Sequence, residues 1–217
     1  EGLTPIPSAA LSLPDADQLA RLVALGPVKI SLDLDCGWNG EYTSQNVIGE
    51  ITGRSKPDGV VVIGGHLDSW DLGTGRVIAF ANEEQGLYGG RAYAEKHAAD
   101  IRKHQLGAES DFGAGRIYAF AAKTPDYAKD AVATIAQALA PLGIEHRADG
   151  DGCGPDLSPF NAIGMACAGL SQDGTDYFDL HHTPDDALDK IDPKALAQTV
   201  AAYTVFAYLA ADAVGDF

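Results

Sequence analysis

Continuous apolar runs recur along the chain and are separated by longer segments of mixed polarity. Runs without polar alternation are typical of strands that are buried on both faces of a parallel sheet. They lie at 60–63, 76–81, 116–122 and 165–170. A weaker strand signal precedes Asp111. Two segments nearer the start, 28–35 and 46–52, also predict strands, and the first of them alternates between apolar and polar residues.

Helical periodicity fills the intervals between these runs. Predicted helices cover 15–25, 85–99 and 125–142, and a long last helix starts after Asp192. Asp192 and Pro193 supply that helix with an N-cap and a first-turn proline. Its predicted apolar face contains Leu196, Val200, Tyr203, Ala207 and Leu209 or Ala210. Strands that alternate with helices predict an α/β fold, which we expect to be a three-layer α/β/α domain with a mostly parallel mixed sheet.

Polar residues follow several of the predicted strands. Ligands of open α/β sheets bind beyond the carboxyl ends of the strands, so we expect these side chains to meet at one edge. They are His66 and Asp68 after the first run, Glu83 and Glu84 after the second, Asp111 after the weak strand, and His181 and His182 after the last run.

Histidine and carboxylate donors without cysteine suit zinc or a similar transition metal better than calcium. His66 could bind a metal while Asp68 holds its second ring nitrogen; the alternative is a loop histidine with a helix-capping aspartate. Glu83 and Glu84 point in opposite directions if they leave a strand, so one can bind a metal while the other acts as a general base. Alternatively they are an acidic helix start, and Asp111 is a turn residue.

Composition narrows the choice of partners. The 217 residues are 46% apolar and 21% charged, as in soluble globular proteins. Their 15 basic and 31 acidic residues give a net charge of −16, which argues against nucleic acid and favours cations. No apolar run approaches the length of a membrane span. Cys36, Cys153 and Cys167 leave open one disulfide with a free thiol, or three thiols.

Four motifs carry a family resemblance. In chain order they are GGHLDSWDLGTG, FANEEQGLYGG, ESDFGAG and DYFDLHHTPDD. They resemble the dizinc aminopeptidase and glutamate carboxypeptidase family of metallopeptidases, and within it the branch of plasma glutamate carboxypeptidase. The resemblance covers nearly the whole chain. It implies a zinc-exopeptidase fold and zinc-dependent hydrolysis of terminal peptide bonds in short peptides or dipeptides.

The resemblance also implies a role for each motif residue. The intact family site contains two zinc ions, held here by His66 and Asp111 for one ion and by Glu84 and His182 for the other. Glu83 is the implied general base that activates the attacking water. Asp68 orients His66, and Tyr177 helps to polarise the scissile carbonyl. His182 is chosen over His181 because it directly precedes the Thr-Pro pair.

One departure from the family concerns the residues after Gly75. The family has an Asp-Asp-Gly-rich stretch there, which supplies a carboxylate that bridges both metals, and then a helix. Here Gly75 is followed directly by Arg76. Parallel neighbouring strands normally need a crossover of about a dozen residues or more, usually helical. We therefore infer that a segment is missing at this junction; Asp71 is the nearest substitute carboxylate, and activity should fall steeply without a bridge.

A second departure from the family lies at the start of the chain. Residues 1–34 resemble only the end of the protease-associated domain found in this branch. We expect 1–34 to be a remnant of that domain and a linker, and 35–217 to be the catalytic domain. A short peptide substrate and a periplasmic or secreted location follow from the resemblance, and a homodimer stays open. The alternatives are a truncated, catalytically impaired relative that serves as a binding or interaction module, and a glycosidase, which the diverging Glu83 and Glu84 disfavour.

Overall fold

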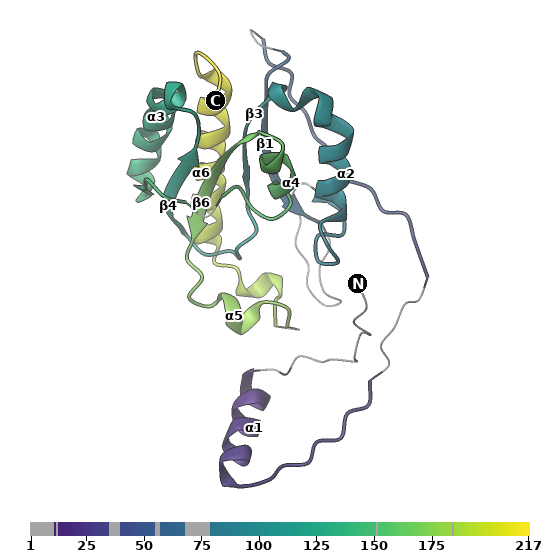
Figure 1. Cartoon of the computed structure of the whole chain (residues 1–217). Coiled ribbons are helices and arrows are strands. Elements are labelled where there is room, and N and C mark those ends of the chain that lie inside the picture. Colours follow the sequence, from purple (N-terminus) through teal and green to yellow (C-terminus); the bar gives the residue numbers. More distant parts are fainter. Residues whose placement is uncertain are drawn as a thin grey trace. The chain divides into compact units, whose positions relative to one another are not determined.

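The computed structural model describes residues 11, 13–34, 40–54, 57–67, 79–150, 152–183 and 185–217. The chain divides into two compact units, Glu1–Thr43 and Ser44–Phe217 (Figure 1). Each unit is described by itself. The domain assignment expected from the sequence, 1–34 and 35–217, stays a prediction.

The first unit contains one helix, α1 (Leu13–Leu25), among its described residues, which confirms the helix predicted at 15–25. The strand predicted at 28–35 is wrong for the described residues 28–34, which are not part of any sheet. Its apolar residues Val28, Ile30 and Leu32 are between 40% and 62% exposed. An alternating segment becomes a strand only when a neighbouring strand pairs with its backbone.

The second unit is built on a sheet whose described strands are β1 (Val60–His66), β2 (Ala79–Phe80), β3 (His104–Glu109), β4 (Ile117–Lys123), β5 (Glu145–His146) and β6 (Ala166–Gln172). Their order is β2-β1-β3-β6-β4-β5. Neighbours are parallel except β4 and β6, which are antiparallel. The prediction of a mostly parallel mixed sheet is confirmed.

Helices cover both faces of this sheet (Figure 1). One face packs against α3 (Lys129–Leu139) and α6 (Pro193–Asp212), and the other against α2 (Tyr88–His97) and α4 (Ser158–Ala162). A short helix, α5 (Tyr177–Leu180), follows β6. Turns of 3-10 helix lie at Ala98–Lys103, Asp126–Ala128, Ala140–Leu142 and Leu188–Lys190.

Alternating side chains of the strands divide the core into two clusters. On β1, Val61 and Ile63 pack against the cluster beneath α3 and α6, whereas Val62 packs against the cluster beneath α2 and α4. On β6, Ala166 and Cys167 divide in the same way. Successive residues of a strand point to opposite faces, so a sheet covered on both sides requires uninterrupted apolar runs. The three-layer α/β/α prediction is confirmed.

The last helix begins as the sequence predicts, and its apolar face is confirmed in part: Tyr203 and Ala210 are buried, and Ala207 and Leu209 pack against the core. Asp192 Oδ1 accepts a hydrogen bond from the backbone N–H of Lys194 at 2.9 Å, and Pro193 occupies the first turn. Leu196 and Val200, however, are 44% and 57% exposed. The buried face is Ala195, Gln198, Thr199, Ala202, Tyr203, Phe206 and Ala210.

Gln198 explains the rotation of this face. Its side-chain amide donates to the carbonyl of Ile117 at 2.7 Å and accepts from the N–H of Ile117 at 2.9 Å. This pairing places a polar side chain at the centre of the face that contacts β4, where periodicity alone predicts an apolar residue.

The strand predicted at 46–52 is also wrong. The side chain of Asn46 donates to the carbonyl of Gly89 at 3.0 Å and accepts from the N–H of Ala81 at 3.0 Å. Asn46 therefore joins this segment to the rest of the second unit through a side chain and not through a strand ladder. None of the helices in the described part of the chain combines the length and apolarity needed to cross a membrane.

Candidate metal centre

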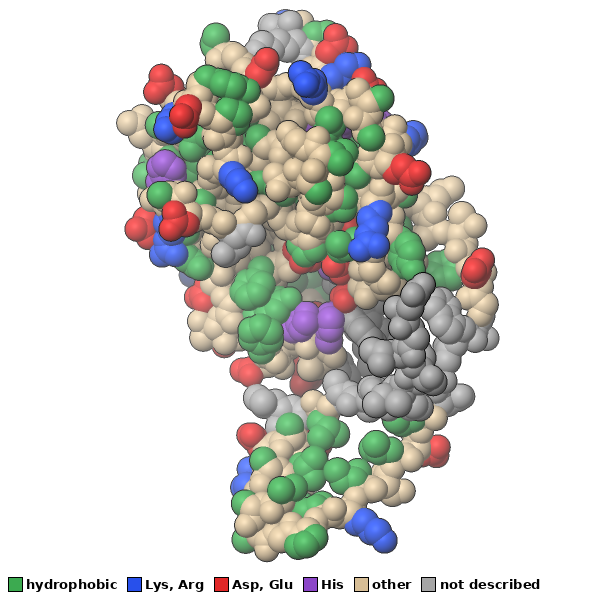
Figure 2. All heavy atoms as spheres, viewed as in Figure 1, with side chains coloured by type: hydrophobic (Ala, Val, Ile, Leu, Met, Phe, Trp, Pro, Cys, Tyr) green, Lys and Arg blue, Asp and Glu red, His purple; other side chains and the backbone are tan. Residues whose placement is uncertain are grey.

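The residues predicted to form a site meet at one edge of the sheet. Strands β2, β1, β3 and β6 are adjacent and mutually parallel, so their carboxyl ends lie at the same edge. A cavity of about 860 Å³ opens there, and the described residues predicted to be functional all line it: His66, Glu83, Glu84, Asp111, Tyr177 and His182. In the space-filling view, histidine side chains lie beside acidic ones on this face (Figure 2).

Within the cavity the four predicted ligands form two pairs. His66 Nε2 lies 3.1 Å from Asp111 Oδ1, with side chains 21% and 24% exposed. His182 Nε2 lies 2.9 Å from Glu84 Oε1, with side chains 36% and 15% exposed. Each pair joins residues that the family resemblance assigns to the same metal ion, although they come from strand ends far apart in the sequence.

The two pairs are connected through Glu83. One donor atom each from His66, Glu83 and Glu84 lies within 4.8 Å of the others. Two ligands of a tetrahedral zinc ion, each about 2.0–2.1 Å from it, are separated by about 3.3 Å. The separations of 2.9 and 3.1 Å within the pairs are those of histidine–carboxylate hydrogen bonds, and they are close enough for a metal ion to replace each bond. The donor set therefore fits zinc.

Unusual backbone conformations occur at and beside the predicted site residues. Among the described non-glycine residues, Asn82, Leu87 and His182 alone have positive φ, at 58°, 60° and 59°. Asn82 and Leu87 flank the Glu83–Glu84 pair, and His182 is itself a predicted ligand. Such conformations are costly for residues with a side chain and concentrate at functional sites, where the surrounding structure fixes them.

The loop that carries Asp111 is held by hydrogen bonds that the sequence did not reveal. The N–H of Ser110 donates to Gly64 O at 2.9 Å, and Gln172 Nε2 donates to the carbonyls of Gly113 and Gly115 at 3.0 and 3.3 Å. A Cβ on Gly115 would lie 1.9 Å from the carbonyl oxygen of Asp173, so only glycine fits this approach. Gln172 is the last residue of β6, a position that periodicity alone does not mark.

A buried carboxyl group lies close to the predicted ligand Asp111. Glu109, two residues before Asp111, is 7% exposed; its Oε2 accepts from Leu157 N at 3.3 Å, and its carbonyl accepts from Tyr203 Oη at 2.6 Å. Burial, followed by the negative charges of Asp156 and Asp111, raises the pKa of Glu109 to about 8. Glu109 therefore keeps its proton at neutral pH, although the motif gave no reason to single it out.

The cavity is strongly acidic beyond its predicted ligands. Additional carboxylates line it, namely Asp173, Asp176, Asp186 and Asp192, and Lys190 is the lone lysine or arginine among the described lining residues. Burial, together with the negative charges of Asp111, Glu84, Asp186 and Glu83, raises the pKa of Tyr177. Such a cavity attracts cations.

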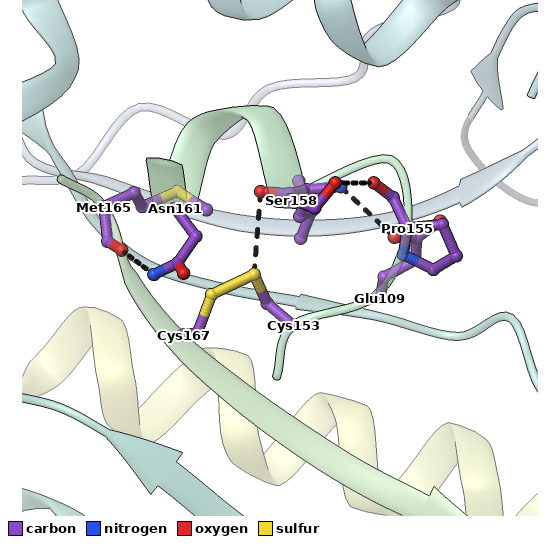
Figure 3. The surroundings of a disulfide bond; sticks show 8 residues. Glu109, Cys153, Pro155, Ser158, Asn161, Met165 and Cys167 are labelled. Atoms are coloured by element: carbon purple, nitrogen blue, oxygen red, sulfur yellow. Dashed lines mark hydrogen bonds between the residues drawn. A yellow bond between two sulfur atoms is a disulfide. The ribbon is translucent and has the colours of Figure 1, made fainter. Parts of the chain in front are cut away.

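Cys153 and Cys167 form a disulfide next to Glu109 (Figure 3). This bond settles the pairing that the sequence left open for these two residues. Cys153 lies in the segment before α4 and Cys167 on β6, and both are buried, at 4% and 2% exposure.

Some residues of interest lie outside the described part of the chain. They are Asp68, predicted to orient His66; Asp71, the substitute bridge; Cys36; and the Gly75–Arg76 junction. The roles given to Asp68 and Asp71 stay predictions.

Comparison with known proteins places this site in a family. The model of peptidase family M28 matches residues 76–207, more than half of the chain. The chain belongs to peptidase family M28. Carboxypeptidase Q of Mus musculus is 29% identical over 242 residues, and that of Homo sapiens is 28% identical over 243 residues. Each alignment covers 98% of this chain and 51% of the relative, so the chain spans about half the length of the curated relatives it matches.

Solved structures agree with this assignment. The crystal structure of a peptidase M28 precursor from Shewanella amazonensis SB2B superposes with a TM-score of 0.86 at 40% identity, over 100% of this chain and 56% of that one. The aminopeptidase from Aneurinibacillus sp. strain AM-1 superposes with a TM-score of 0.54 at 23% identity, over 74% of this chain and 46% of that one. The second likeness concerns the fold alone.

The alignments also bear on the short crossover after Gly75. An alignment of 242 residues exceeds the 217 residues of this chain, so the carboxypeptidase Q relative carries residues within the shared region that this chain lacks. The family match begins at Arg76 and leaves out the segment that contains His66. The segment inferred to be missing at the Gly75–Arg76 junction stays a prediction.

Proposed function

We propose that the chain catalyses zinc-dependent hydrolysis of terminal peptide bonds in short peptides or dipeptides. The observation that carries this proposal is the meeting of two histidine–carboxylate pairs, with Glu83 beside them, in one acidic cavity at the carboxyl edge of the sheet. Membership of peptidase family M28 and the carboxypeptidase Q relatives support peptide hydrolysis as the reaction.

The residues divide the work as follows. His66 and Asp111 would hold one zinc ion, and Glu84 and His182 the other. Bound zinc supplies Lewis acidity toward water and the scissile carbonyl. Glu83, whose carboxylate lies within reach of both pairs, takes the proton of the attacking water and passes it to the leaving amine. Asp68 orients the imidazole of His66, and Tyr177 contributes to the wall of the substrate cavity.

A periplasmic or secreted location forms part of the proposal. Its support is the disulfide between Cys153 and Cys167, since disulfides persist mainly in oxidising compartments. The acidic cavity and the net charge of −16 favour peptides over nucleic acid as the partner.

A second candidate function is favoured by the residues that the relatives have and this chain lacks. If the bridging carboxylate of the family is among them, two zinc ions at close range would repel each other. The chain would then hold at most one zinc ion weakly and act as a catalytically impaired binding module.

Glu83→Gln separates the two functions. The substitution removes the base and keeps the shape of the side chain, so turnover of an unblocked dipeptide should fall by about 10²–10⁴-fold while bound zinc, measured by inductively coupled plasma mass spectrometry, stays unchanged. Glu95→Gln, an exposed glutamate on α2 outside the cavity, is the matched control and should retain full turnover.

The outcomes are distinct. A wild type that holds at most one weakly bound zinc ion and shows no turnover supports the binding module. Turnover of the Glu83→Gln variant at the wild-type rate would show that Glu83 is not the general base. Parallel assays of N-acetylated and C-amidated dipeptides show which terminus must be free.

A further inference from the structure

Beside the two ligand pairs, four aromatic rings are stacked in a row. The ring centroids of Phe112 and Tyr177 are 4.1 Å apart with an interplanar angle of 17°, those of Tyr177 and His181 are 4.6 Å apart at 27°, and those of His181 and His182 are 3.6 Å apart at 24°. The row starts at the residue after Asp111 and ends on His182. It therefore joins the two loops that carry ligands of different pairs.

Two glycines make room for this ring row. A Cβ on Gly174 would lie 2.2 Å from Cε1 of Phe112, and a Cβ on Gly113, whose φ is +72°, would lie 3.1 Å from the ring of Tyr177. A side chain at Gly174 would push the first ring out of the row. The sequence thus has glycine at both places where the loop backbones approach the rings.

The far end of the ring row holds a residue in a costly conformation. His182 has a φ of 59° while its imidazole contacts Glu84 at 2.9 Å. A residue with a side chain keeps such a backbone only where its neighbours fix it. The ring of His181, stacked on that of His182 and backed by Tyr177, is such a neighbour.

We propose that the ring row is a positioning device for the metal centre, with Tyr177 as its central member. Phe112, Tyr177 and His181 hold the loops of Asp111 and His182 at the separation that two metal ligand pairs require. They act through their ring faces, so the hydroxyl of Tyr177 is dispensable for this role. The inference rests on the proposed function in that Asp111 and His182 are taken as metal ligands. It also competes with the role of carbonyl polarisation, which requires the hydroxyl.

Paired substitutions in the full chain separate a ring effect from a hydroxyl effect. Tyr177→Leu removes the ring and Tyr177→Phe keeps it; His181→Leu and His181→Phe do the same one step along the row. The readouts are the affinity for Zn²⁺, by competition with a chromophoric chelator, and the absorption spectrum of the Co²⁺-loaded protein, which reports ligand geometry. Loss of residues that orient metal ligands typically weakens metal affinity by about 10–100-fold, and we expect this from both leucine variants. Both phenylalanine variants should match the wild type in affinity and spectrum.

Tyr93→Leu is the matched control. Tyr93 also lies in a stack, between His97 at 4.2 Å and Phe160 at 5.1 Å, but it does not line the metal cavity. Its removal should lower the stability of the fold and leave Zn²⁺ affinity unchanged. If Tyr177→Leu does not fold, Phe112→Leu tests the exposed end of the row, where the side chain is 43% exposed.

Three results would overturn the inference, and they differ from one another. Leucine variants that bind Zn²⁺ as tightly as the wild type would show that the ring row does not position the metal ligands, and would leave the proposed function unaffected. Loss of affinity or altered spectra in Tyr177→Phe equal to that in Tyr177→Leu assigns the effect to the hydroxyl. A wild type that binds neither Zn²⁺ nor Co²⁺ removes the proposed function together with the ring row.

Discussion

Removal of the Cys153–Cys167 disulfide measures how far the second unit depends on a covalent crosslink. The two cysteines are separated by 14 positions in the sequence. A crosslink that closes a loop of about 15 residues restricts the unfolded chain by about 3 kcal/mol at 25 °C in the chain-entropy model. Since both side chains are buried, alanine at both positions adds roughly 1 kcal/mol for lost packing. The variant Cys153→Ala/Cys167→Ala should therefore lose about 3–4 kcal/mol of unfolding free energy.

Equilibrium unfolding in urea, followed by circular dichroism, measures this difference. Reductant should lower the midpoint of the wild type and leave that of the double variant unchanged, because the variant has no bond to break. Thiol titration of the wild type, unfolded without reductant, should find the single thiol of Cys36. Equal midpoints for wild type and double variant, or three reactive thiols in the unreduced wild type, would refute the crosslink as a source of stability.

Three further substitutions test other parts of the fold. Burial raises the pKa of Glu109 from its ordinary value of 4.5 to about 8, so Glu109 keeps its proton in the native state over this range. Wild-type stability should therefore fall as pH rises from 4.5 to 8, by at most about 5 kcal/mol, and Glu109→Gln should abolish this fall in urea titrations of metal-free protein. Asp192→Ala removes the N-cap of α6 and should cost about 1 kcal/mol in the same assay, with Asp192→Asn retaining most of the stability. Gln198→Leu leaves the buried N–H and C=O of Ile117 without the amide and should cost about 2–5 kcal/mol; a wild-type urea midpoint would show that water replaces it.

The parts of the site that the sequence predicted are those set by strand ends. His66 and Glu84 follow apolar runs and Asp111 follows a weaker strand signal, and the parallel sheet brings such positions to one edge whatever the detailed packing. The pairing of His66 with Asp111, and of Glu84 with His182, came from the family resemblance, because strand order cannot be read from periodicity.

What the sequence did not predict depends on contacts between distant segments. Glu109 and Gln172 read as ordinary strand residues, and only the packing of β3, β6 and α6 shows that one is buried beside Asp156 and that the other holds the loop of Asp111. Strand partners are likewise non-local, which is why the alternating segment at 28–35 misled the prediction. Gln198 turned the buried face of α6 for the same reason.

Anomalous diffraction from a zinc-soaked crystal, recorded on both sides of the zinc absorption edge, shows whether the two histidine–carboxylate pairs bind zinc. We expect zinc density in the cavity, between His66 and Asp111 and between Glu84 and His182, with Glu83 beside it. Ordered side chains at these positions in a zinc-saturated crystal, without anomalous density among them, would contradict it.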